Sequence, residues 1–137
     1  MKFAHTAWTT APPEKIWAAW TDVKRWPQWD TELASASLEG GFAIDAKGKL
    51  KPKRGPASGF TISELTPGES YAFTTRLPLC ELEVRRRLTR KDGGGACFTH
   101  EVTFTGPLSF VFGNLLGRRY REALPAVMEN LRKTAES

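Results

Sequence analysis

The hydrophobic repeat of the chain changes once, and this change restricts the fold more than any other feature. Residues 32–105 form short β-like runs separated by turn sequences, of which Asp92-Gly93-Gly94-Gly95 is the clearest. After Gly106-Pro107 the apolar residues recur about every 3.6 positions, which is typical of an amphipathic helix. A run of strands followed by a terminal helix predicts an α+β domain and excludes a parallel doubly wound fold, in which strands and helices alternate.

Seven strands are predicted in all. The first covers residues 2–9 and ends before Ala11-Pro12-Pro13, and a helix over residues 13–21 follows because proline suits a first helical turn. Six further strands fit the alternating runs and the turn sequences between them. They are expected at residues 32–38, 44–51, 58–65, 70–76, 81–90 and 96–105.

Proline shapes two other predicted segments. Pro27 lacks an amide donor, so residues 23–30 are expected to form only a very short helix or turn, with Trp26 and Trp29 packed inward. The terminal helix is predicted over residues 108–135, with a bend near Pro125. Its apolar stripe consists of Phe112, Leu116, Tyr120, Leu124, Val127 and Leu131.

Composition describes an ordinary globular domain of 137 residues, so we expect one domain over residues 1–137. The net charge of +5 comes from scattered basic residues, which predicts no nucleic-acid partner. Residues 108–116 are the longest apolar run and are broken by polar residues and glycine, so neither export nor a membrane span is expected. Cys80 and Cys97 are too few for a disulfide framework or a zinc site, and two free thiols fit a reducing cytoplasm.

Three stretches of the sequence resemble those of a known superfamily. They are APPEKIWAAWTDVKRWPQWD near the start, ELTPGESYAF in the middle and THEVTFTGPLSFVFGNLLGRRYREALPAVMENLRK at the end. With the order of elements, they resemble the START-like (SRPBCC) superfamily, specifically the small bacterial polyketide cyclase/dehydratase-like proteins. The resemblance implies a helix-grip fold, in which a seven-stranded antiparallel sheet wraps around the C-terminal helix and leaves a pocket for a hydrophobic ligand. It says little about the ligand.

Two polar residues share the inward phase of the last two predicted strands. If residues 92–95 close a hairpin, residues whose numbers sum to about 186 lie opposite, which makes Arg86 and His100 neighbours. Such a pair can hold an anionic or carbonyl-bearing ligand, with Arg86 as a fixed cation and His100 as donor, acceptor or proton shuttle. Alternatively, His100 is a satisfied interior histidine and Arg86 reaches solvent at the pocket mouth.

The remaining residues of these strands fit less specific roles. Arg85 and Arg87 have the opposite phase and are expected on a solvated face. Their expected cross-strand partners are Glu81, Glu83, Glu101 and Thr103. His5 shares the phase of Phe3 and Ala7, which allows an inward position as well as an edge or surface position.

The aromatic residues supply most of the predicted ligand contacts, although plain core packing is the alternative for each of them. The expected ligand-binding residues are Trp26, Trp29, Phe60, Tyr71, Phe73, Arg86, Phe98, His100, Phe112, Leu116 and Tyr120. Familiar catalytic motifs are missing, and two histidines with two unclustered cysteines predict no metal site and no cofactor.

Three functions are compatible with these features. The first is a cytoplasmic protein, monomeric or homodimeric, that binds a hydrophobic or aromatic small molecule. The second is a cyclase, aromatase or dehydratase in which His100, Arg86 and Tyr120 polarise a carbonyl or move a proton. The third is a protein-interaction module that uses an exposed surface such as residues 118–121.

Overall fold

The seven strands of the computed structural model, which describes residues 1–137, form one antiparallel sheet in the order β1-β7-β6-β5-β4-β3-β2. Six of them begin and end within one residue of the prediction from sequence. The strands are β1 (Lys2–Thr9), β2 (Leu33–Leu38), β3 (Lys47–Pro52), β4 (Ser58–Thr66), β5 (Ser70–Leu77), β6 (Cys80–Arg90) and β7 (Ala96–Thr105).

The exception is β3, which begins at Lys47 rather than at residue 44. Asp45 has a φ of +70°, a left-handed conformation that an extended strand cannot contain. Its amide donates to the carbonyl of Ile62, and Ile44 is exposed. The β-branched residue at position 44 therefore belongs to a turn, and its strand propensity is overridden by the local backbone conformation.

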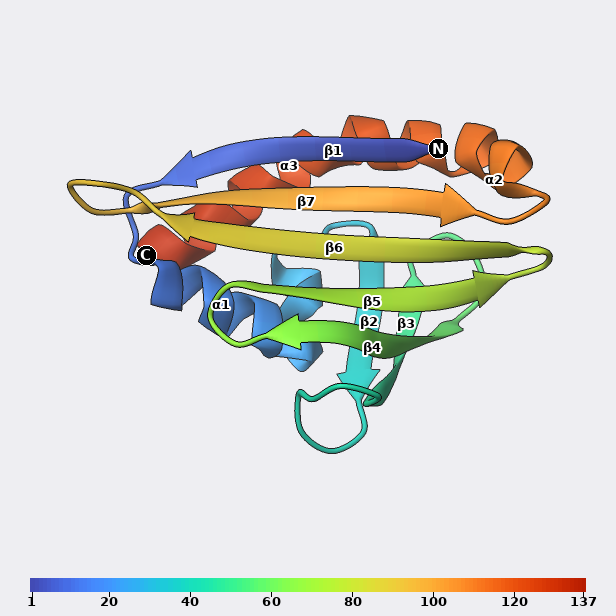
Figure 1. The fold of residues 1–137 in the computed structure, drawn as a ribbon, viewed down its shortest axis with the longest axis horizontal. Coiled ribbons are helices and arrows are strands. Elements are labelled where there is room, and N and C mark those ends of the chain that lie inside the picture. Colours follow the sequence, from blue (N-terminus) through green and yellow to red (C-terminus); the bar gives the residue numbers. More distant parts are fainter.

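The sheet is strongly curled, so that β2 and β3 run across the direction of the other strands (Figure 1). Register shifts occur between Leu33 and Ser35 in β2 and between Ile62 and Glu64 in β4. Bulges of this kind bend a strand and increase its twist. They allow the sheet to close over one side of the molecule.

Two short helices connect β1 to β2. They are α1 (Pro13–Thr21) and the 3-10 helix η1 (Val23–Gln28), as the sequence predicts. Trp26 and Trp29 are both buried, which confirms the expected inward packing. The Nε1 atom of Trp26 donates to the carbonyl of Trp20 at 2.9 Å and fixes η1 against the end of α1.

The C-terminal helix differs from the prediction because it is divided. Helix α2 (Ser109–Leu115) is followed by α3 (Gly117–Glu136), with a one-residue interruption at Leu116. Helix α3 continues through Pro125, where the sequence predicted a bend. The interruption lies beside Gly117, whose position would place a Cβ atom 2.3 Å from the Phe3 ring, so this glycine allows close contact between the helix and β1.

Helix α3 packs on β1 and α1 and crosses behind the sheet, while α2 lies at the end nearest the N-terminus (Figure 1). At the opposite end, the hydroxyl of Thr9 donates to Glu136 at 2.8 Å, joining the end of β1 to the end of α3. The helix is therefore held along its length against the concave face of the sheet, as the helix-grip prediction requires.

The β6–β7 hairpin has the predicted register. Arg86 pairs with His100, and residues paired along the two strands have numbers that sum to 186. Gly93, Gly94 and Gly95 all have positive φ values in the turn, and a Cβ atom at residue 95 would lie 2.4 Å from the carbonyl oxygen of Thr9. Glycine at this turn therefore fixes the pairing of the two longest strands.

Gly48 on β3 makes room for an aromatic ring in the core. A Cβ atom there would lie 2.4 Å from both the Phe60 ring and the carbonyl oxygen of Ser37. Neither the backbone of β2 nor the buried ring can move freely, because Phe60 packs on Trp26 and Phe73 at centroid distances of 5.7 and 5.1 Å.

We expect Gly48→Ala to lower the free energy of unfolding by about 1–3 kcal/mol through overpacking. Gly59→Ala is the matched control, since its Cβ atom would meet only ordinary contact at 3.7 Å on the neighbouring strand. Urea unfolding of both variants measures the difference. Equal stability of the two would show that β2 and β3 yield without cost at Gly48.

Candidate ligand cavity

A cavity of about 290 Å³ lies between the concave face of the sheet and helix α3. Its walls come from η1, from strands β2 to β7 and from the N-terminal part of α3, with the β3–β4 turn at one side. The volume is close to the lower end of ordinary small-molecule pockets, which span about 300–1,000 Å³. No helix is both long enough and apolar enough to cross a membrane.

Six of the eleven residues predicted to bind ligand line this cavity. They are Trp26, Phe73, Arg86, His100, Leu116 and Tyr120. The three side chains proposed from sequence as catalytic candidates are therefore on the wall of one empty volume. Leu82, Val84 and Val102, which have the same inward phase as Arg86 and His100 on β6 and β7, line the cavity as well.

The other five predicted contacts are in the surrounding core. Trp29, Phe60, Tyr71 and Phe98 are buried against other aromatic rings, while Phe112 of α2 is half-buried beside the core. Phe60 fills the space above Gly48, and Tyr71 contacts Trp17, Trp20 and Phe42 in edge-to-face pairs. Inward phase identified all five as interior residues, but whether an interior residue borders an empty volume depends on how its neighbours fill space.

Several lining residues were not singled out from the sequence. They include Asp30, Glu32, Leu50, Arg54, Thr75 and Arg119. Thr75 lies two residues from Phe73 on the same face of β5, so strand alternation was a sufficient signal for it. Arg54 of the β3–β4 turn had no such signal, because this turn reaches the cavity only through the curl of the sheet.

Arg86 is buried, with 5% of its surface exposed, rather than extended to solvent as one sequence-based alternative proposed. Its guanidinium carbon lies 4.9 Å from the ring centroid of Trp26 and 5.1 Å from that of Trp29. Tyr71 and Phe73 complete the aromatic surroundings at 5.7 and 5.4 Å. The electron-rich faces of these rings stabilise the cation within the apolar interior.

Hydrogen bonding satisfies Arg86 only in part. The Nη1 atom donates to the hydroxyl of Tyr71, whereas the buried Nε atom has no partner. Arg86 takes part in none of the ion pairs of the protein. A guanidinium carries five N–H donors, so this buried cation retains unused hydrogen-bonding capacity.

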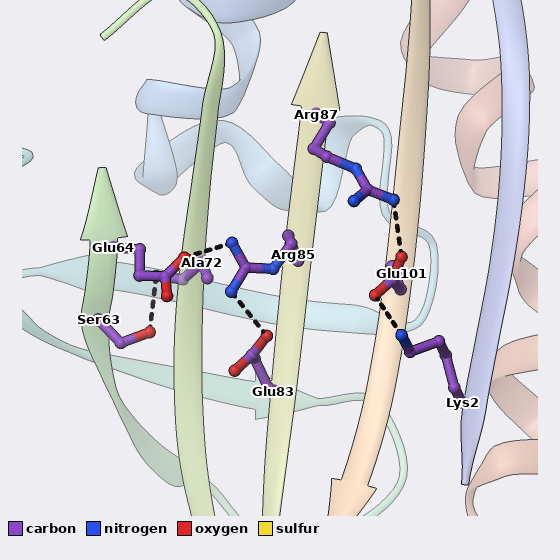
Figure 2. Close-up of polar contacts among 8 residues, drawn as sticks. All are labelled: Lys2, Ser63, Glu64, Ala72, Glu83, Arg85, Arg87 and Glu101. Carbon is purple, nitrogen blue, oxygen red and sulfur yellow. Dashed lines mark hydrogen bonds and ion pairs between the residues drawn. The ribbon is translucent and has the colours of Figure 1, made fainter. Parts of the chain in front are cut away.

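The arginines on either side of it face outward and are paired. Figure 2 shows Arg85 bound to Glu64 and Glu83, and Arg87 bound to Glu101, which also contacts Lys2. The solvated face expected from the strand phase is confirmed, and Glu101 is a cross-strand partner as predicted. Glu83 is not a cross-strand partner, because it contacts Arg85 from the same strand. Glu64, on β4, is a partner that the sequence did not identify.

His100 is also buried, and the protein fixes its tautomer. Trp20 donates from Nε1 to Nε2 of His100 at 3.1 Å, so the neutral ring carries its proton on Nδ1. Burial lowers the pKa of His100 well below its usual value, and the nearby charge of Arg86 and the adjacent His5 act in the same direction. His5, half-buried, pairs with His100 across β1 and β7, which is the inward position among the expected alternatives.

Two oxygen-bearing side chains on the cavity wall remain protonated more readily than usual. Burial raises the pKa of Asp30, although the charge of Arg86 partly opposes this effect. Burial also raises the pKa of Tyr120 to about 12, so its hydroxyl keeps its proton at neutral pH. The Tyr120 hydroxyl can therefore donate a hydrogen bond on the cavity wall, as Arg86 does.

A curled seven-stranded sheet holding a C-terminal helix over an inner cavity defines a helix-grip protein of the START-like class. The family described as "Polyketide cyclase / dehydrase and lipid transport" matches residues 1–136, and the chain belongs to it. A sequence comparison with the curated proteins gives no match.

Solved structures share the fold at low sequence identity. Protein MLL2253 from Mesorhizobium loti is 17% identical with a TM-score of 0.77, covering 99% of this chain and 97% of its own. Hypothetical protein jhp0584 from Helicobacter pylori is 7% identical with a TM-score of 0.83, and the match covers 98% of this chain and 88% of the other. Ara h 8.0201 is 18% identical with a TM-score of 0.68, and the match covers 96% of this chain and 97% of the other. At these identities the likeness concerns the fold alone.

The low pKa of His100 predicts a pH-dependent stability. Below about pH 6.5 the unfolded chain binds a proton at this histidine and the folded chain does not, so stability is lost as the pH falls. We expect the loss to approach about 1.4 kcal/mol per pH unit between about pH 6.5 and 5.

The comparison is with His100→Gln, which keeps an acceptor for Trp20 and cannot titrate. Asp30, whose raised pKa acts in the opposite direction, is present in both proteins and cancels in the difference. Urea unfolding at several pH values measures the difference between the two proteins in the free energy of unfolding. Parallel pH profiles for the two proteins would contradict a neutral, buried His100.

Proposed function

We propose that the protein binds a hydrophobic or aromatic small molecule, without a cofactor, in the cavity between the sheet and α3. The observation that carries the proposal is the cavity itself, whose surface is mostly apolar and whose buried polar residues Arg86 and His100 lie on the sheet side. Membership of a family described by cyclase, dehydrase and lipid transport activities supports a ligand of this kind. Free Cys80 and Cys97 support a cytoplasmic location.

An enzyme of the cyclase or dehydratase type is the second candidate, because Arg86, His100 and Tyr120 line the same volume. The state of His100 favours binding over catalysis. Its Nε2 atom is occupied by Trp20, and its lowered pKa leaves little imidazolium to act as an acid at neutral pH. Arg86 and Tyr120 can still polarise a carbonyl, which is the chemistry that such an enzyme would use here.

The apolar dye N-phenyl-naphthylamine tests the binding proposal, since its fluorescence rises in an apolar environment. Ala123 lines the cavity from α3, so we expect Ala123→Trp to fill the space and to weaken dye binding by about tenfold or more. Ala126→Trp is the matched control, because Ala126 is exposed on the same helix.

Thermal unfolding confirms that both variants remain folded. The expected result is a saturable increase in fluorescence for the wild type and for Ala126→Trp only. If Ala123→Trp binds the dye as tightly as its control, the cavity is not the binding site and the proposal fails.

A further inference from the structure

We infer that the cavity selects amphipathic organic acids, whose oxyanion head contacts Arg86 while an apolar body occupies the rest of the space. This inference rests on the proposed function and specifies the class of its ligand. It follows from three properties of the wall: an unpaired buried cation, a neighbouring donor of fixed tautomer and an apolar remainder.

No ion pair balances the charge of Arg86. It lies on the cavity wall with 5% of its surface exposed, its Nε atom has no partner, and it makes no ion pair. Aromatic rings and the Tyr71 hydroxyl stabilise the cation without neutralising it. An oxyanion of a ligand would supply the missing charge and accept the unused N–H groups, in a site where low polarity strengthens both interactions.

His100 lies beside Arg86 across the β6–β7 pair and, like Arg86, can only donate a hydrogen bond to a ligand. Because Nε2 accepts from Trp20, the proton of the neutral ring is on Nδ1, and the ring is available to a ligand only as a donor. Arg86 can only donate, and the proton of Tyr120 is retained. A ligand group that contacts Arg86 and His100 must therefore accept hydrogen bonds.

Asp30 is the one carboxyl group on the wall that could instead serve as a counter-ion for Arg86. It forms no ion pair with Arg86, and its pKa is raised by burial, which disfavours the charged form needed for that role. In its charged form Asp30 would compete with the ligand oxyanion for Arg86. Glu32, on the same wall, is exposed to solvent.

The remainder of the wall is suited to an apolar body. Two rows of inward side chains lie between the Arg86 and His100 pair and Cys80, the first residue of β6. These rows consist mainly of aliphatic and aromatic residues. Helix α3 faces them with Ala123, Leu124 and Val127. One buried cation bordering an apolar space fits a ligand with one anionic head and an otherwise hydrophobic structure.

Two dyes that differ by one charged group test the inference. Anilinonaphthalene sulfonate carries an oxyanion, and N-phenyl-naphthylamine has the same ring system without it. We expect the wild type to bind the sulfonate about tenfold or more tightly than the neutral dye, because a hydrogen bond to a charged group is worth about 1.5–3 kcal/mol. Fluorescence titration and competition between the two dyes measure the ratio.

The variants assign the preference to Arg86. Arg86→Met is expected to weaken sulfonate binding by about tenfold or more while changing binding of the neutral dye by less than about threefold. Arg87→Met is the matched control, since its side chain is on the outer face (Figure 2). Asp30→Asn is expected to strengthen sulfonate binding. Arg86→Lys retains a cation, so it should keep part of the preference if Arg86→Met does not fold.

The possible failures are distinguishable. Equal binding of both dyes to the wild type, with Ala123→Trp blocking both, would overturn the inference and leave the proposed function intact. A preference for the sulfonate that survives Arg86→Met or Arg86→Lys unchanged, or that is lost in Arg87→Met, would also overturn it. If neither dye binds in the cavity, the proposed function fails and the inference fails with it.

Discussion

The requirement to hold a guanidinium inside an apolar domain explains much of the surrounding structure. Moving a charged group from water to a medium of low polarity costs several kcal/mol unless other groups stabilise it. Around Arg86 this stabilisation comes from the faces of Trp26, Trp29, Tyr71 and Phe73, together with one hydroxyl group. Trp26 belongs to η1, Trp29 directly follows it, and the other two belong to β5, so the placement of the cation depends on how η1 packs against the sheet.

The same arrangement determines the state of His100. Trp20 reaches it from α1 and accepts no hydrogen bond in return, because an indole nitrogen only donates. Trp20 is itself connected to η1 through the bond between its carbonyl and Trp26. The two short helices thus help to fix both Arg86 and His100, one by ring faces and one by a directed hydrogen bond.

Family and fold limit the function of this chain without naming its ligand. Helix-grip structures with 7–18% identity to it share the curled sheet and the terminal helix, and a fold of this kind serves many functions. What distinguishes members is the set of polar groups that face the inner space. In this chain the set includes one buried cation without an ion pair, beside a histidine that can only donate, and this chemistry, rather than the fold, directs attention to acidic ligands.

The sequence by itself determined the strands, the helical segments and the register that makes Arg86 and His100 neighbours. These depend on local signals: alternation along a strand, the glycine turn at residues 93–95 and the change of period after Gly106. Only the tertiary structure decided that Arg86 is enclosed rather than solvated, that His100 is bonded to Trp20, and which inward residues border empty space. Those outcomes depend on contacts between segments far apart in the chain and on the volume each side chain fills, neither of which a local pattern encodes.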